Sequence, residues 1–177
     1  MREIAATLRK LESKLVEDIP RHHSNTFRAI EALIAVYREL DSRPALPQVA
    51  SPDGGWAISA ELARLLVEQV LLYRPKVIVE FGSGTSTVVL GHIAKRLPDV
   101  RVVSIEHDSL WYADTLVALN AQGLHNVELL YAPLTPTQVQ GREFVWYDTE
   151  ALSGLFDIDF VLVDGPPSHI GPEARYP

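Results

Sequence analysis

Residues 77–87 read VIVEFGSGTST: a mostly β-branched apolar run, an acid and an aromatic, a Gly-Ser-Gly turn and three hydroxyl residues. The apolar run is typical of a buried strand, and the glycines are typical of a tight loop from which a helix starts. A second apolar run, residues 102–105, ends in Glu106. The stretch therefore predicts a strand, a helix and a second strand, with an acid near the end of each strand.

Such a unit is typical of nucleotide binding, because its glycines let the backbone approach the ligand and the acid after the second strand accepts ribose hydroxyls. The dinucleotide fingerprint needs a third glycine, but Thr87 stands at that position. Glu80 beside the turn would repel a pyrophosphate and attract a cation. S-adenosylmethionine carries a sulfonium and an ammonium and no phosphate, so the charges favour it. An NAD(P)-dependent reductase is the less favoured alternative.

Composition excludes several other classes. The chain has 177 residues, enough for one domain with its own core, and a net charge of -7, which disfavours nucleic acid as a partner. It contains no cysteine, which excludes disulfides and thiolate chemistry. We expect no membrane span, because no apolar run approaches the required length. The charged, amphipathic start is unlike a signal peptide, so we expect a cytoplasmic protein.

Periodicity predicts the remaining elements. We expect an N-terminal helical hairpin over 1–41 (helices 1–19 and 24–40), a Pro/Gly-rich loop over 42–58, and a Rossmann-like domain over 59–177. The second helix of the hairpin should face inward with Phe27, Ile30, Ile34 and Tyr37. In the domain, a helix from Ser59 to Arg74 should bury Leu62, Leu65, Leu66 and Val70. Strands are expected at 77–81, 101–106, 127–132 and 158–163, helices at 86–96 and 109–121, and a loop with a short helix near 148–154.

The alternation of helices and strands predicts an α/β fold: a parallel sheet of strand order 3-2-1-4 with helices on both faces. The fourth strand contains the continuous apolar run 160–163, which is typical of a strand buried on both faces.

Three motifs, EFGSGTST (80–87), EHD (106–108) and VLVDGPP (161–167), resemble the class I S-adenosylmethionine-dependent methyltransferases in order and spacing. With GGWAIS (54–59), YAPL (131–134) and ARYP (174–177), the chain is similar to a bacterial group often associated with glycan biosynthesis. The resemblance covers residue 54 to the end. It implies S-adenosylmethionine as methyl donor and S-adenosylhomocysteine as product.

The resemblance also implies roles by position. The residues expected to line the methionyl half of the cofactor and to receive its carboxylate are Glu80, Gly82, Ser83, Gly84, Thr85, Ser86 and Thr87. Glu106 should bind the ribose, and His107, Asp108, Ala132 and Pro133 the adenine. Asp164 is the expected catalytic residue, and Trp56 and His169 are candidates for a lid or substrate contact.

The resemblance implies methyl transfer to an oxygen of a small molecule or glycan, with a nitrogen acceptor left open. The family continues with further strands beyond the fourth, so we expect a fragment, a truncated gene product, or a subunit whose strand edge a partner covers. A homodimer could form through the N-terminal helices or that edge. The second acidic pair of metal-dependent relatives is not present, so no metal site is expected. The alternative function is a non-catalytic cofactor-binding or assembly module.

Overall fold

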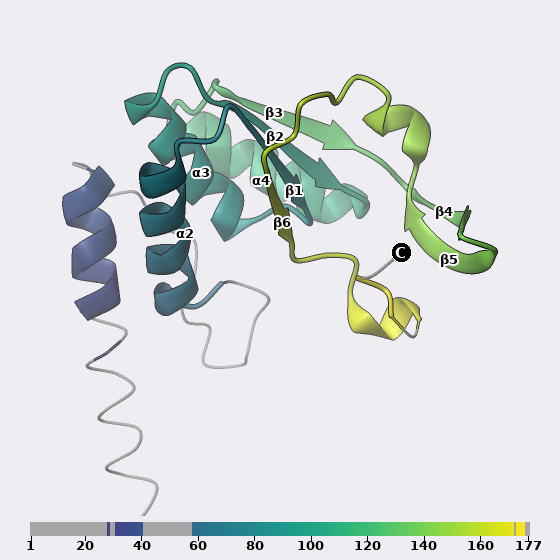
Figure 1. Ribbon diagram of the computed structural model, residues 1–177. Coiled ribbons are helices and arrows are strands. Elements are labelled where there is room, and N and C mark those ends of the chain that lie inside the picture. Colours follow the sequence, from purple (N-terminus) through teal and green to yellow (C-terminus); the bar gives the residue numbers. More distant parts are fainter. Residues whose placement is uncertain (1–27, 29–30, 41–57, 172, 176–177) are drawn as a thin grey trace, which may run out of the picture.

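The computed structural model describes residues 28, 31–40, 58–171 and 173–175. Its main sheet has four parallel strands in the order β3-β2-β1-β6 (Figure 1). The strands are β1 (Val77–Phe81), β2 (Arg101–Glu106), β3 (Val127–Tyr131) and β6 (Phe160–Val163). This confirms the predicted α/β class and strand order. The predicted fourth strand is labelled β6, because the two strands of a hairpin precede it in the chain.

Three helices, α2 (Ala60–Tyr73), α3 (Thr85–Arg96) and α4 (Ser109–Ala121), pack on one face of this sheet. Two of them begin at capping side chains. The Ser59 hydroxyl accepts a hydrogen bond from the Leu62 N–H (3.2 Å), and the Asp108 carboxylate accepts from the N–H groups of the second and third residues of α4. Residues 31–40 are also helical. Ile78 and Val102 of the sheet meet α2 and α3 in the largest apolar cluster.

A hairpin occupies residues that we expected to be a loop. Strands β4 (Leu134–Val139) and β5 (Arg142–Tyr147) pair antiparallel, and the short helix η1 (Thr149–Leu152) follows as predicted. Gln140 and Gly141 join the strands with φ of 51° and 79°, as a two-residue hairpin turn requires. Glutamine rarely takes positive φ, so the turn was not visible in the sequence. In Figure 1 the hairpin lies at the right and α2 at the left.

The second face of the sheet is covered differently from our expectation of helices on both faces. Here Val79, Val103 and Ile105 pack against Trp146 and Tyr147, together with apolar residues of η1 and its C-terminal turn. The connection from β3 to β6 is a hairpin and a single helical turn, so within the described residues no α-helix covers this face. Val161 and Val163 of β6 consequently remain 52% and 38% exposed. β6 is an edge strand of the described sheet, so an apolar run typical of a strand buried on both faces is here partly exposed.

Two predicted inward faces are also corrected. In the helix at 31–40 the buried residues are Ala32, Val36 and Leu40, whereas Ile34 is 46% exposed. In α2, Leu66 and Val70 are buried as predicted, but Leu62 and Leu65 are exposed. In both helices apolar residues occur on more than one face, so periodicity alone did not select the buried one. Residues 1–27, including Phe27, and also Ile30 and the loop 42–57, lie outside the described residues.

No helix among the described residues is long and apolar enough to cross a bilayer. The predicted domain boundaries stay a prediction.

Asp159, just before β6, holds the start of β1. Its two carboxylate oxygens accept hydrogen bonds from the Lys76 and Val77 N–H groups, both at 2.9 Å. These bonds lower the pKa of the Asp159 carboxyl. They join two strands that are more than eighty residues apart in the chain and so fix the register of β6 against β1.

We expect Asp159→Ala to lower the melting temperature, because two backbone donors of the strand start lose their acceptor. Asp99→Ala is the matched control: Asp99 reaches Lys76 only through an ion pair of 3.8 Å between exposed side chains. Circular dichroism melts of both variants at pH 7 should show a clear decrease for the first and almost none for the second. Equal melting temperatures would contradict the role given to Asp159.

Candidate functional site

The loops that follow β1 and β6 touch each other at the carboxyl edge of the sheet. The Phe81 carbonyl accepts hydrogen bonds from the Asp164 and Gly165 N–H groups, both at 2.8 Å. Gly82 has φ of 93°, and a Cβ built on it would lie 2.8 Å from the Gly165 nitrogen. A side chain at residue 82 would therefore separate the loops. β1 and β6 flank the position where the strand order reverses, which is where open α/β sheets bind ligands.

Glu80 is fully buried under this edge. Its Oε2 accepts hydrogen bonds from the hydroxyls of Thr87 and Ser104, both at 2.6 Å. The Thr87 hydroxyl in turn accepts from the Gly84 N–H at 2.9 Å, so one threonine connects the glycine turn to the acid. The second oxygen, Glu80 Oε1, is buried without a hydrogen-bond partner.

Burial raises the pKa of Glu80 to about 7, and the hydroxyl groups of Ser104, Ser86 and Thr87 oppose the rise; the charge of Asp164 adds to it. The carboxyl therefore exchanges its proton near neutral pH. A cation placed beside Oε1 would favour the ionised form.

Glu106 ends β2 and is also buried, but all of its acceptor positions are used. Oε2 accepts from the Ser83 N–H (2.8 Å) and the Ser83 hydroxyl (3.1 Å). Oε1 accepts from the His107 N–H (2.7 Å) and the Asp108 N–H (2.9 Å), and His107 Nδ1 lies 3.0 Å away. Burial acts to raise the pKa of this carboxyl, but the hydrogen bonds prevail and the pKa is lowered. Glu106 is thus an anion, with Oε2 bonded to Ser83 of the glycine turn and Oε1 bonded to the backbone after β2.

The Ser83 hydroxyl also lies 3.0 Å from the hydroxyl of Thr115 in α4. It therefore has an alternative partner if another group takes its place on Glu106. Thr115 and Ser104 are polar, almost fully buried, and were not identified from the sequence. Isolated hydroxyl residues within apolar elements formed no pattern to recognise.

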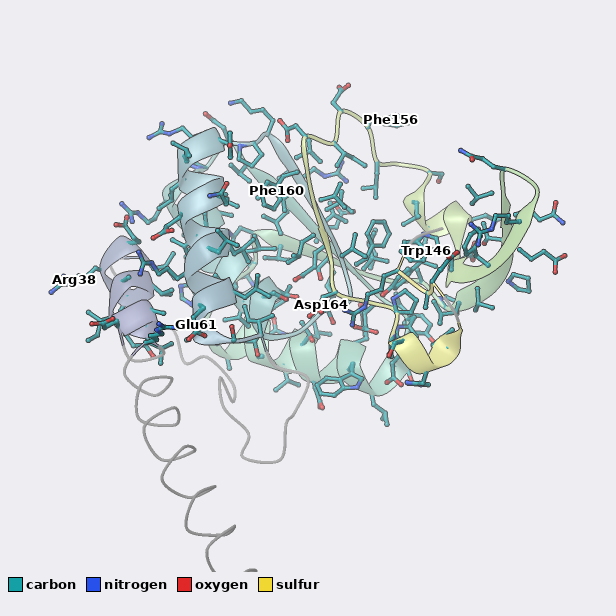
Figure 2. The ribbon with its side chains drawn as sticks, turned by 60° about the horizontal axis from the view of Figure 1, so that its bottom comes forward. Arg38, Glu61, Trp146, Phe156, Phe160 and Asp164 are labelled. Atoms are coloured by element: carbon teal, nitrogen blue, oxygen red, sulfur yellow. The ribbon has the colours of Figure 1, made fainter. Side chains whose placement is uncertain are left out.

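Asp164 lies at the carboxyl end of β6, in the loop that touches Gly82 (Figure 2). Burial raises the pKa of its carboxyl and the charge of Arg175 opposes this. Arg175 comes from the C-terminal segment: a guanidinium nitrogen lies 3.8 Å from Asp164 Oδ1, and its Nε donates to the Pro166 carbonyl at 3.3 Å. Arg175 belongs to the ARYP motif, but no feature of that motif singled it out.

Tyr147, the last residue of β5, enters the same region from the hairpin. Its ring packs against Phe81, Trp146 and His107, with centroid distances of 5.3, 5.2 and 5.7 Å. Burial raises the pKa of its phenol, as do the charges of Glu106, Glu80 and Asp164. Tyr147, which was not predicted, thus lies against the residue that follows each of the three predicted acids, namely Phe81, His107 and Gly165. The hairpin itself was not predicted, so nothing placed residue 147 near the strand ends.

The other predicted residues have varied positions. Thr85 and Ser86 are buried in the first turn of α3, and Ala132 follows β3, where its N–H donates to the Glu106 carbonyl at 2.8 Å. The Pro133 carbonyl accepts from the Asp148 N–H. The Asp108 carboxylate is occupied in capping α4. His169 lies in the short helix η2 (Ser168–Ile170) after the Asp164 loop, and Trp56 lies outside the described residues.

The described part of the chain contains no group of three or more His, Cys, Asp or Glu side chains placed to hold a metal ion.

Comparison with solved structures finds the crystal structure of a methyltransferase from Podospora anserina with S-adenosylhomocysteine bound. The TM-score is 0.51 at 19% sequence identity, and the match covers 76% of this chain and 50% of that one. The likeness shows a shared fold, and the chain spans about half the length of this methyltransferase. No protein-family model and no curated protein sequence matches the chain.

We expect the buried Glu80 to make stability depend on pH. Its pKa in the folded protein, about 7, is above the unfolded value of 4.5, so the folded state holds the proton more tightly. Its contribution to stability is full below about pH 4.5 and is lost as pH rises to about 7. Glu80→Gln mimics the neutral form, so its stability relative to the unmodified protein should increase over this range, by up to about 3 kcal/mol. Urea unfolding at pH 5, 6, 7 and 8 measures the difference. A difference independent of pH would contradict the raised pKa.

A second prediction concerns the contact between Gly165 and Tyr147. A Cβ on Gly165 would lie 2.3 Å from the Tyr147 hydroxyl oxygen, which is a steric clash in a fully buried site. Gly165→Ala should therefore destabilise the protein, by about 1–3 kcal/mol. Tyr147→Phe removes the clashing oxygen, so the double variant should regain much of the loss. Additive effects in a double-mutant cycle would show that the two residues are not in contact.

Proposed function

We propose that this chain is the cofactor-binding part of an S-adenosylmethionine-dependent methyltransferase, which transfers a methyl group to an oxygen of a small molecule or glycan. The observation that carries the proposal is the charge of the site. Glu80, Glu106 and Asp164 meet at the carboxyl edge of the sheet around a glycine turn, and Arg175 is the cation described beside them. Such a site suits a ligand with a cationic end.

The site fits this cofactor in two further respects. Glu80 Oε1 and the Tyr147 hydroxyl are both buried without a hydrogen-bond partner, so the region contains polar atoms that a ligand could satisfy. The methyltransferase of similar fold has S-adenosylhomocysteine bound. A pyrophosphate, by contrast, would meet the Glu80 carboxylate, which Thr87 connects to the glycine turn, and this disfavours a dinucleotide.

In this proposal Glu106 binds the ribose. All four of its acceptor positions are filled in the described structure, so one donor must leave before a ribose hydroxyl can bind. The Ser83 hydroxyl is the donor that can leave at low cost, because it can turn to Thr115. The N–H groups at the start of α3, in Thr85, Ser86 and Thr87, would receive the carboxylate of the cofactor.

The cofactor supplies the methyl group as a sulfonium electrophile, and the protein positions the acceptor and removes its proton. Asp164 is the proposed base, because it ends β6 beside the turn and remains partly exposed. Burial raises the pKa of its carboxyl, and Arg175 limits the rise and can orient the carboxylate. Resemblance of the motifs to methyltransferases linked with glycan biosynthesis supports a hydroxyl acceptor.

Calorimetric titration of the chain with S-adenosylhomocysteine tests the proposal. We expect micromolar binding that Glu106→Ala weakens tenfold or more, about 1.4 kcal/mol. The matched control is Glu128→Ala: Glu128 lies on the neighbouring strand β3 and pairs with Arg101 on the exposed surface, and its loss should leave binding unchanged. Absence of binding by a folded sample, or binding of NADH instead, would contradict the proposal. Binding without methyl transfer to any hydroxyl or amine would favour the non-catalytic module.

A further inference from the structure

Thr115 is a polar residue within α4, and only 3% of its surface is exposed. Its hydroxyl oxygen lies 3.0 Å from that of Ser83, which in turn donates to Glu106 Oε2 at 3.1 Å. A hydroxyl group has one proton and two lone pairs, so the hydrogen bond between Ser83 and Thr115 can run in either direction. The two hydroxyls and the carboxylate therefore form a short chain whose direction can reverse.

Glu106 accepts from three other donors, and none of them can turn away by itself. They are the backbone N–H groups of Ser83, His107 and Asp108, at 2.8, 2.7 and 2.9 Å. A backbone N–H moves only with its peptide unit, whereas a serine hydroxyl changes its partner by rotation about a single bond. The Ser83 hydroxyl is therefore the group that can make room on Oε2.

The Ser83 hydroxyl can leave Glu106 at low cost only if another acceptor is ready for its proton, because a polar group without a partner is unfavourable in a partly buried site. Thr115 Oγ1 is already at hydrogen-bonding distance. The Thr115 proton then needs its own acceptor, and a threonine within a helix can donate to the carbonyl four residues earlier, here that of Trp111. Each hydroxyl proton thus has an acceptor before and after the reversal.

We propose that Thr115 is a positioning residue for the cofactor: it accepts the Ser83 hydroxyl proton when a ribose hydroxyl replaces Ser83 on Glu106 Oε2. The inference rests on the proposed function and adds to it a residue of α4 that acts through Ser83. Asp108 holds this helix in place, because its N–H donates to Glu106 and its carboxylate caps the start of α4. Thr115 and the carboxylate that binds the ribose are therefore connected through one short segment.

A purely structural Thr115 would behave differently. Its loss would then weaken ligand binding to the same extent whether or not residue 83 has a hydroxyl. A Ser83 hydroxyl that contacts the ligand directly would also be distinguishable, because its removal would weaken binding. The proposal requires the opposite in both respects: the effect of Thr115 depends on the Ser83 hydroxyl, and a protein without that hydroxyl binds at least as well.

A double-mutant cycle tests the proposal, with the Kd of S-adenosylhomocysteine measured by calorimetry at pH 7.5. We expect Thr115→Val to weaken binding about tenfold, the effect of one hydroxyl left without an acceptor in the complex. Ser83→Ala should bind at least as tightly as the unmodified protein, because the ribose then meets no competitor on Glu106. On that background Thr115→Val should change Kd by less than about twofold, so the two effects are not additive.

Two further variants complete the experiment. Thr115→Ser keeps the hydroxyl and should bind like the unmodified protein. Thr137→Val makes the same chemical change in β4, where the hydroxyl donates locally to the Thr135 carbonyl, and it should leave Kd unchanged. Circular dichroism melts establish that each variant is folded. If Thr115→Val does not fold, Thr115→Ala replaces it in the cycle, and failure of both to fold would show a structural hydroxyl and overturn the proposal.

The remaining outcomes separate the role of Thr115 from the proposed function. Equal weakening by Thr115→Val on both backgrounds, no weakening on either, weaker binding by Ser83→Ala, or failure of Thr115→Ser to restore binding would each overturn the role of Thr115 and leave the function intact. If the folded, unmodified protein binds no S-adenosylhomocysteine, the function and the role of Thr115 both fall.

Discussion

The hydrogen bonds of the buried Glu80 carboxylate organise the carboxyl edge of the sheet. Through Thr87 the carboxylate holds the first turn of α3 and the Gly84 N–H, and through Ser104 it is tied to the middle of β2. One side chain thus connects a strand, the glycine turn, the following helix and the neighbouring strand. In the same turn Gly82, which has no side chain, lies directly against the loop after β6.

Polar groups under the turn create an electrostatic asymmetry. Glu106 remains ionised because four donors surround it, whereas Glu80 has two donors on one oxygen and none on the other. Burial acts to raise the pKa of both carboxyls, but the hydrogen bonds outweigh it only at Glu106, so the pKa values of two glutamates on adjacent strands shift in opposite directions. In such a site Glu106 is always charged, and Glu80 becomes charged when a cation approaches. The site can therefore bind a cation and yet remain stable without it.

The sequence predicted what depends on local pattern. Strands β1 and β2 and helix α4 have the predicted bounds, since apolar runs, proline and glycine mark their ends. Glu80, Glu106 and Asp164 were found because each lies at or near the end of an apolar strand, and parallel strands bring their carboxyl ends to one edge. The hairpin was missed because Gln140 takes positive φ without a recognisable turn motif. Tyr147 and Arg175 were missed for the same kind of reason: their positions depend on tertiary contacts that no spacing in the sequence encodes.

The two unsatisfied oxygens reveal how stability and binding compete at this edge. Leaving Glu80 Oε1 and the Tyr147 hydroxyl without partners lowers the stability of the ligand-free protein, and phenylalanine at residue 147 would remove one of these unsatisfied groups. A sequence under no demand but folding would gain by that change. Such unfavourable groups persist where the surrounding structure holds them and where a ligand can use them. Tyr147 is held by three aromatic neighbours and Glu80 by two hydroxyls. The surrounding core thus keeps both oxygens in fixed positions. A ligand that hydrogen-bonded to either of them would not lose affinity through ordering the side chain.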